Sequence, residues 1–406
     1  MLHDNANARR GRYDDSLRNI LNIQAADESR AWLSTWEGLN AGPTPLWNLP
    51  ELAARLRVGS ISVKDEGHRS ALGSFKALGA PIALIRLIRR LWPEQDFVAA
   101  TLTTGHYKAL LRNFTVISAT DGNHGRALAA AARSIGCRCV IVLHRHVNDE
   151  RRVAIEQLGA QIVQIDGNYD ESVKEATRLG GEHGWHVVSD TSYDGYETIP
   201  RDVMQGYGTI AAEAIEQRDG GSYTHIFIQG GVGGLAAGVV SYFAERFGER
   251  RPQCVIVEPV QADCLFQSAT QGQAAHATGS VDSIMAGLAC GEASPLAWRF
   301  LHVLADVFMT IPDDVAIEAM RTFAEGSAGD VPVVAGESGA AGLAGLIQVA
   351  GSAEDRVALG LGMESNVLLL NTEGATAPEL YRQLTGLRAD DVLEAQRRWL
   401  GQQEGR

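Results

Sequence analysis

The order of strand, glycine turn and helix is clearest in Ile226-Phe227-Ile228-Gln229-Gly230-Gly231-Val232-Gly233-Gly234-Leu235-Ala236-Ala237-Gly238. An apolar run that ends in glycines and continues as a helix start is typical of a parallel strand followed by its covering helix. Glycines let backbone N–H groups converge on an anion, and the helix N-terminus adds a partial positive charge. This stretch predicts an α/β fold with an anion-binding turn.

The same alternation continues along the chain. The predicted strands are Ile61–Lys64, Thr115–Ala119, Cys139–Leu143, Gln161–Ile165, Val187–Ser189, Thr224–Gln229, Gln253–Glu258, Asp306–Thr310 and Asn366–Leu370. Helical patterns between them include Arg126–Ile135, Asp149–Leu158, Glu171–Glu182 and Asp202–Gln217. Such alternation predicts two domains, each centred on a parallel sheet covered by helices. We expect a large domain of residues 1–88 and 206–406, and a small inserted domain of residues 89–205.

The N-terminal residues 1–60 have the character of a peripheral lead-in, in which Pro43, Pro45 and Pro50 mark an extended connection. The segment Met1–Tyr13 lacks the apolar core of a signal peptide. No apolar run reaches the roughly 18 residues that a membrane span needs. We therefore expect a cytoplasmic protein.

The chain of 406 residues carries a net charge of −13, with an isoelectric point near 5.3. This acidity argues against nucleic-acid and anionic-membrane partners, which favour a basic face. The five cysteines lack zinc-site spacing, and no metal is expected. Reduced thiols are the favoured interpretation, although Cys264 and Cys290 lie in loop-like segments that leave a disulfide open.

Lysine is rare here, since only Lys64, Lys76, Lys108 and Lys174 occur among 36 basic residues. Lys76 stands in Gly73-Ser74-Phe75-Lys76-Ala77-Leu78-Gly79-Ala80, a setting of small and apolar residues. A guanidinium stays protonated and cannot form a Schiff base, whereas a lysine amine can. Lys76 is therefore a candidate for covalent catalysis, with an ordinary exposed helix lysine as the alternative.

A second strand, turn and helix runs from Thr115 to Ala127 through Asp121-Gly122-Asn123-His124-Gly125. Asn123 can hydrogen-bond through either amide atom. Asp121, taken alone, has the position of a helix cap. His124 is interpreted as a structural turn histidine.

Other uses of the glycine turn remain open from the residues alone. It lacks the Gly-Lys-Ser/Thr ending of a P-loop, so an NTPase is not expected. An NAD site is an alternative, because Glu258 ends the next strand where a ribose-binding acid would lie. A tight turn without a ligand is another.

Taken together, the three motifs resemble the fold-type II pyridoxal-phosphate enzymes, the serine/threonine dehydratase and cysteine synthase superfamily with a tryptophan synthase β-like fold. The resemblance covers roughly residues 40–380. It implies pyridoxal 5'-phosphate in the cleft between the domains, held by Lys76 as a Schiff base. It further implies a homodimer. The cofactor contacts that it implies besides Lys76 are Asn123, Gly231, Val232, Gly233, Gly234, Leu235 and Thr372.

Further segments resemble one family within this superfamily, the diaminopropionate ammonia-lyases, which convert 2,3-diaminopropionate to pyruvate and two ammonia molecules. These segments are Val188-Ser189-Asp190-Thr191-Ser192-Tyr193, Met285-Ala286-Gly287-Leu288-Ala289-Cys290-Gly291-Glu292, Gly336-Glu337-Ser338-Gly339 and Asn371-Thr372-Glu373-Gly374. Asp121 also stands where dehydratases and racemases usually have a small residue or serine.

The resemblance implies that Lys76 removes the α-proton of the L-isomer and Asp121 that of the D-isomer. Asp190, Thr120 and Tyr169 are the implied substrate contacts. Asp190 could instead cap the following turn, and Glu337 could be a structural acid.

Three other functions remain open. A serine/threonine dehydratase shares the scaffold, but Asp121 and Asp190 suit a substrate with a second amine better than one with a hydroxyl. A cysteine-synthase-like replacement enzyme would need a second substrate site. A non-catalytic pyridoxal-phosphate or amino-acid sensor would be expected to lose Lys76 or the glycine turn, and this chain keeps both.

Overall fold

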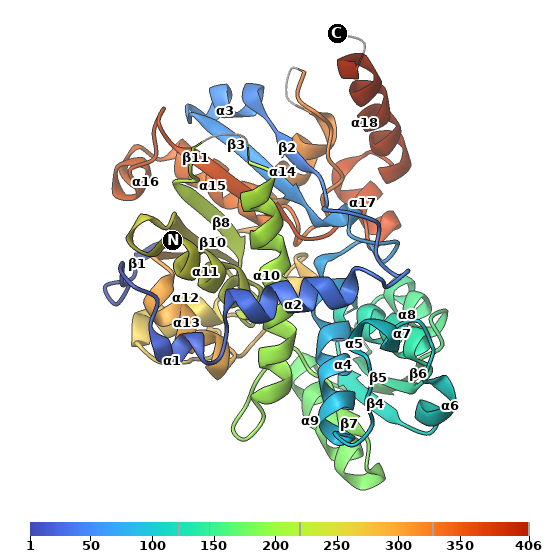
Figure 1. Cartoon of the computed structure of the whole chain (residues 1–406). Coiled ribbons are helices and arrows are strands. Elements are labelled where there is room, and N and C mark those ends of the chain that lie inside the picture. Colours follow the sequence, from blue (N-terminus) through green and yellow to red (C-terminus); the bar gives the residue numbers. More distant parts are fainter. Residues whose placement is uncertain (121, 146, 219–220, 327–328, 405–406) are drawn as a thin grey trace.

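The computed structural model describes residues 1–120, 122–145, 147–218, 221–326 and 329–404, and it contains two helix-covered sheets (Figure 1). The larger sheet has seven strands in the spatial order β1 (Leu2–Asp4), β10 (Val307–Ile311), β9 (Gln253–Pro259), β8 (His225–Gln229), β11 (Asn366–Asn371), β3 (Ser60–Asp65) and β2 (Leu46–Asn48). The smaller sheet has four parallel strands in the order β6 (Gln161–Ile165), β5 (Arg138–His144), β4 (Thr115–Ala119) and β7 (His186–Val187).

Helices fill the connections between the strands. Those before β8 are α1 (Asp15–Arg18), α2 (Ile23–Leu33), α3 (Pro50–Leu56), α4 (Ala80–Leu91), α5 (Ala99–Leu102), α6 (Lys108–Leu111), α7 (Asn123–Ile135), α8 (Asp149–Glu156), α9 (Tyr169–His183) and α10 (Thr198–Glu216). Those after β8 are α11 (Gly234–Phe247), α12 (Cys264–Gln271), α13 (Pro295–Leu304), α14 (Asp313–Glu325), α15 (Ala341–Gly351), α16 (Ala353–Leu359), α17 (Pro378–Thr385) and α18 (Ala389–Glu404).

The central strands of both sheets are buried on both faces, which explains why they are almost continuously apolar. In β8, Ile226 and Ile228 pack toward α11, whereas Phe227 packs toward α15 on the opposite face. The small sheet repeats the arrangement: Val116 of β4 faces the cluster that contains α7, and Ile117 faces the one that contains α9. The alternation follows from the period of two along a strand.

The parallel arrangement brings the carboxyl ends of several strands to one cleft. The turns after β4, β8 and β11, together with the segment after β7, all contribute side chains to a single cavity. In open α/β sheets, ligands bind beyond the carboxyl ends of the strands. The fold therefore positions the predicted motifs for one shared site.

The prediction that residues 1–60 are peripheral is wrong. β1 pairs antiparallel with β10, and β2 pairs antiparallel with β3, so this segment forms both edges of the large sheet. α2 packs across α10 (Figure 1). Each of the two edge strands has three residues, which is too short for an alternating pattern to reveal.

The nine predicted strands all occur. Thr115–Ala119 and Gln161–Ile165 have the predicted bounds, and the others differ by at most two residues at an end; β7 is His186–Val187 rather than Val187–Ser189. All five cysteines are free, so Cys264 and Cys290 are not joined by a disulfide. Within the described ranges no helix combines the length and the apolar character needed to cross a bilayer. The four strands of the small sheet fall within residues 89–205, but the domain bounds themselves stay a prediction.

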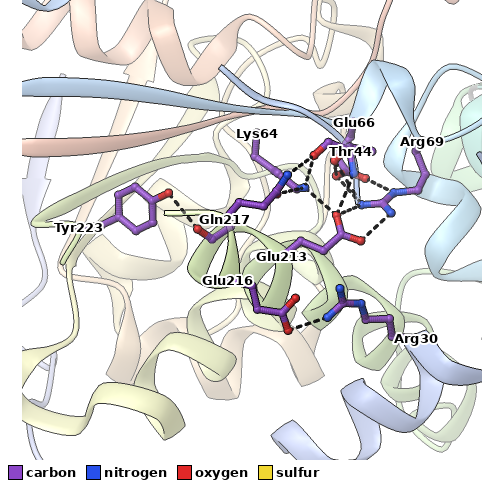
Figure 2. A network of polar contacts seen from close by, with 10 residues as sticks. Arg30, Thr44, Lys64, Glu66, Arg69, Glu213, Glu216, Gln217 and Tyr223 are labelled. Carbon is purple, nitrogen blue, oxygen red and sulfur yellow. Dashed lines mark hydrogen bonds and ion pairs between the residues drawn. The ribbon is translucent and has the colours of Figure 1, made fainter. Parts of the chain in front are cut away.

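A buried ionic network anchors the segment that leads from β3 to Lys76 (Figure 2). Arg69 donates to the carboxylates of Glu66 and Glu213, and Lys64 Nζ lies 2.6 Å from Glu213 Oε2. Glu213 belongs to α10, whereas the other three residues lie in β3 or just after it. Because buried charges are costly unless paired, this network holds the start of the segment against α10 in one geometry.

Candidate active site

Lys76 lies in the 3₁₀ turn Phe75–Leu78, which is tied to the end of β11. Phe75 donates its backbone N–H to the carbonyl of Thr372, and Ser74 forms an antiparallel bridge with Glu373. The Lys76 ammonium lies 5.1 Å from the Phe75 ring centroid. These contacts hold the amine at the cavity between the two sheets.

Asp190 is the carboxylate partner of Lys76. Its Oδ2 atom lies 2.5 Å from Lys76 Nζ, although 114 residues separate the two along the chain. Burial alone would lower the pKa of Lys76, but the Asp190 charge, with Tyr207 and Cys290 also contributing, raises it above the usual lysine value. Burial alone would raise the pKa of Asp190, but the Lys76 cation, followed by His124, lowers it well below the usual range.

Asn123 is the first residue of α7, and its side-chain amide donates to the Glu373 carboxylate. Glu373 also accepts from the backbone N–H of Ser338, at 3.1 Å. The Asn123 amide thus reaches the cavity from α7, beside the small sheet, whereas its acceptor Glu373 follows β11 of the large sheet. Glu373 had no role in the sequence prediction, since nothing in its local pattern indicates a partner 250 residues away.

The glycine turn after β8 has the backbone that an anion site requires. Gly231 has φ +60° and Gly233 has φ +99°, the left-handed region that favours glycine. α11 begins at Gly234, and the first N–H groups of a helix have no partner inside it. Gly231, Val232, Gly234 and Leu235 line the cavity with Lys76, whereas Gly233 lies in the turn but outside the lining.

Thr372, Tyr169 and Thr120 also line this cavity. Tyr169 donates its hydroxyl to Asp190 Oδ1 at 3.5 Å. Thr120 Oγ1 accepts the backbone N–H groups of Gly122 and Gly125, so its oxygen supports the turn. Asp121 lies outside the described residues.

Several lining residues had no predicted role: Arg151, Tyr207, Gln229 and Glu373. The Arg151 guanidinium donates to Glu337, and both side chains are buried. Burial first, and then the Glu373 charge, raise the pKa of Glu337, whereas Arg151 opposes that rise. Arg151 is in α8, beside the small sheet, and Glu337 precedes α15, which covers the large sheet. This ion pair therefore connects the two sides of the cleft.

The residue suggested for an NAD site has another use. Glu258 is fully buried, and its carboxylate oxygens accept the backbone N–H groups of Leu265 and Phe266 at 2.9 and 2.7 Å. It therefore caps the start of α12 and is unavailable to a ribose hydroxyl. The NAD interpretation rested on Glu258, so the structure removes the observation that favoured it.

The sequence and the fold are both similar to those of known proteins. A model of the family described as pyridoxal-phosphate dependent enzyme matches residues 38–373. This chain belongs to that family. The pyridoxal-phosphate dependent enzymes that it resembles most clearly include the diaminopropionate ammonia-lyase of Escherichia coli (strain K12), which is 39% identical over 348 residues, covering 84% of this chain and 87% of the relative.

Solved structures of that family show the same architecture. The crystal structure of holo diaminopropionate ammonia lyase from Escherichia coli superposes with a TM-score of 0.87 at 36% identity, covering 95% of this chain and 96% of the other. The structure of that enzyme in complex with an aminoacrylate-PLP azomethine reaction intermediate gives 0.85 at 35% identity, with the same coverage. The predicted fold, the resemblance and the cofactor are thereby confirmed.

The residues present fit pyridoxal phosphate. The helix start at Gly234 and the two left-handed glycines suit its phosphate, and Lys76 suits its carbonyl carbon. Three buried polar atoms of the lining, His124 Nδ1, Tyr207 Oη and Gln229 Oε1, have no hydrogen-bond partner within the described part of the chain. Such atoms are rare in folded proteins unless a ligand or water completes them.

Proposed function

We propose that this protein, with pyridoxal phosphate, converts either enantiomer of 2,3-diaminopropionate and one water molecule to pyruvate and two ammonia molecules. The β-amine leaves by elimination, and the α-amine leaves by hydrolysis of the product. The observation that carries the proposal is the paired lysine and carboxylate, Lys76 and Asp190, in one cavity with an anion-binding helix start. The similarity to the diaminopropionate ammonia-lyase of Escherichia coli, whose structure with an aminoacrylate-PLP intermediate is known, supports the same reaction.

The cofactor, when bound, withdraws electrons from the substrate α-carbon and so makes its proton removable. Lys76 holds the cofactor at its Nζ atom, and Asn123 and Thr372 orient the ring. Gly231, Val232, Gly233, Gly234 and Leu235 bind the phosphate. This assignment is supported by the arrangement of Lys76, Asn123 and the turn around one cavity.

Lys76 removes the α-proton of the L-isomer and then delivers a proton to the departing β-amine. An amine leaves readily only when protonated, and a lysine that has just accepted a proton is the nearest acid. Asp121 removes the α-proton of the D-isomer from the opposite face. A second base is required there because one amine cannot reach both faces of a planar centre.

Asp190 and Tyr169 recognise the second amine of the substrate, and Thr120 contributes to the same wall of the cavity. Asp190 Oδ1 faces the Tyr169 hydroxyl, while Oδ2 faces Lys76. The two oxygens can therefore serve a substrate ammonium and the lysine separately. A substrate with a hydroxyl in place of the ammonium would not balance the negative charge of Asp190, so we expect weaker binding of serine and threonine.

The proposal includes a homodimer in the cytoplasm, with a large domain of residues 1–88 and 206–406 and a small domain of residues 89–205. The dimer follows from the family resemblance.

Pyruvate release by the cofactor-loaded protein tests the proposal. We expect turnover of D- and L-diaminopropionate with weak activity on D- and L-serine, and little keto acid from L-threonine. Preference for serine or threonine would instead make this a dehydratase. An Asp121→Asn variant should lose turnover of the D-isomer and keep that of the L-isomer; retention of D-activity would contradict the role of Asp121.

A further inference from the structure

His124 is the second residue of α7, and its ring is buried beside Asp190. One ring nitrogen, Nε2, lies 2.8 Å from the carbonyl oxygen of Val188. A carbonyl oxygen only accepts, so Nε2 must carry the hydrogen. In the neutral ring the other nitrogen, Nδ1, is then an acceptor without a proton.

That second nitrogen is poorly placed for a neutral imidazole. His124 Nδ1 lies 3.8 Å from Asp190 Oδ2, so two electron-rich atoms face each other. Nδ1 is buried and has no hydrogen-bond partner among the residues that the structure describes. A proton on Nδ1 would turn this contact into an ion pair and satisfy both atoms.

The same carboxylate oxygen faces both nitrogen atoms. Asp190 Oδ2 is 2.5 Å from Lys76 Nζ and 3.8 Å from His124 Nδ1. While Lys76 is an ammonium, the three residues together are neutral, with one cation, one anion and one neutral ring. If Lys76 becomes neutral, a buried carboxylate remains unpaired unless it keeps the proton itself or a neighbouring group becomes positive.

We propose that His124 accepts the proton that Lys76 gives up, through Asp190, and so keeps this buried unit neutral. The Nζ–H bond of Lys76 breaks, an Nδ1–H bond forms on His124, and Asp190 passes the proton on without net change. A neutral Lys76 is what both covalent attachment and α-proton removal require. His124 is thus a positioning and proton-holding residue, and the inference rests on the proposed function only for the use of that proton.

Burial first lowers the pKa of His124, and the Lys76 cation lowers it further, whereas the Asp190 charge raises it. When Lys76 loses its charge, it no longer lowers the pKa of His124, whereas Asp190 still raises that pKa. His124 is then protonated more easily. The other titratable groups near the unit, among described residues, are the hydroxyls of Tyr169 and Tyr207 and the thiol of Cys290.

The test is an NMR titration of the 406-residue chain with ¹⁵N-labelled histidine rings, without cofactor. In the wild-type chain His124 should be neutral at pH 7 with its hydrogen on Nε2. In Lys76→Met its pKa should rise by at least roughly one unit, because an unpaired carboxylate now lies beside it. The double variant Lys76→Met/Asp190→Asn should lose that rise. An unchanged His124 in Lys76→Met would overturn the proposal.

The chain offers a matched control in His225. Its Nε2 also contacts a backbone carbonyl, that of Leu359 at 2.9 Å, but its Nδ1 already has a partner, Thr224 Oγ1, at 2.7 Å. His225 should titrate identically in all three proteins. Signals are assigned with His124→Gln, which keeps a donor near Val188, and independently with His124→Asn in case one variant misfolds.

Turnover provides a second readout. His124→Gln should lower kcat by roughly 10²-fold and move the acid limb of the pH profile upward, because Lys76 then loses its proton only at higher pH. His225→Gln should keep the wild-type profile. An unshifted profile in His124→Gln would contradict the relay. The titration needs no substrate, so it separates failure of this inference from failure of the proposed reaction.

Discussion

Two lysines in this chain, Lys64 and Lys76, contact buried carboxylates, and their surroundings differ. Lys64 Nζ contacts three acceptors, the Thr44 carbonyl at 2.7 Å, Gln217 Oε1 at 2.7 Å and Glu213 Oε2 at 2.6 Å, and its side chain is 0% exposed (Figure 2). Lys76 has one carboxylate partner among the described residues, and its side chain is 19% exposed at the cavity.

The difference in acceptors and exposure indicates that Lys64 has a structural role, whereas Lys76 is available for catalysis. An ammonium has three N–H donors, and at Lys64 three acceptors are present, so nothing remains for a ligand. Burial is the main influence on Lys64 and lowers its pKa, whereas the Asp190 charge keeps the pKa of Lys76 high despite burial. Of the two, only Lys76 lies at the cavity, and it has one carboxylate partner among the described residues.

The largest expected effect is on turnover, in Lys76→Ala. Activity should fall by about 10⁴-fold, because one side chain anchors the cofactor and moves the α-proton. The exposed Lys174→Ala serves as a control and should keep wild-type activity. Steady-state pyruvate release measures both. A Lys76→Ala enzyme within tenfold of the wild type would erase the distinction between the two lysines.

Lys64→Met should reduce stability instead. Removing one partner of a buried ion pair costs about 3–5 kcal/mol, because the remaining charges lose compensation. Urea unfolding followed by circular dichroism measures the loss, and Lys174→Met should change stability little. Activity per folded molecule should stay near the wild-type value. A loss of turnover without a loss of stability would show that Lys64 takes part in the chemistry.

Asp190→Asn tests the single partner of Lys76. We expect kcat to fall by about 10²-fold, since the variant removes the acceptor through which Lys76 exchanges its proton. KM for diaminopropionate should rise as well, because Asp190 is proposed to meet the second amine. The exposed Asp194→Asn in the same loop is the control. Unchanged kinetics in Asp190→Asn would reduce the Lys76 contact to a packing interaction.

The structural network should also show in the pH dependence of stability. Burial raises the pKa of Glu213, but Arg69 and Lys64 outweigh it and lower the pKa overall. As pH falls below about 4.5, Glu213 therefore takes up a proton more readily in the unfolded chain than in the folded one. The contribution of Glu213 to the free energy of unfolding, which is fully present above that pH, is then lost as pH falls further.

Unfolding free energies between pH 3.5 and 7 test that contribution. The gap between the wild type and Glu213→Gln should shrink as pH falls, by about 1.4 kcal/mol for each unit of pKa difference between the two states. Glu216→Gln, on the same helix but exposed and paired with Arg30, is the control and should give only a small gap at pH 7. A constant gap for Glu213→Gln would contradict the assignment.

The sequence was sufficient for the elements that carry strong local signals. The glycine turn at Gly230–Gly234, the Asn123 turn and the nine apolar strands each have a pattern within about a dozen residues, and parallel topology then brings them together. The edge strands β1 and β2 were missed because three residues cannot show a period.

Contacts between distant residues could not be predicted in the same way. Lys76 with Asp190, Asn123 with Glu373 and Arg151 with Glu337 each join segments more than 100 residues apart. Local pattern carries no information about such pairing. That His124 Nδ1 has no hydrogen-bond partner among the described residues likewise appears only once the Val188 carbonyl and Asp190 are placed around the ring.

Borohydride reduction of the cofactor-loaded protein, followed by peptide mass spectrometry, tests the central claim most directly. Reduction makes the lysine–cofactor bond permanent, so the modified residue can be identified. We predict one pyridoxyl group per chain, located on Lys76, with Lys64, Lys108 and Lys174 unmodified. A label on any other lysine, or none at all, would contradict the assignment of Lys76 as the cofactor-bearing residue.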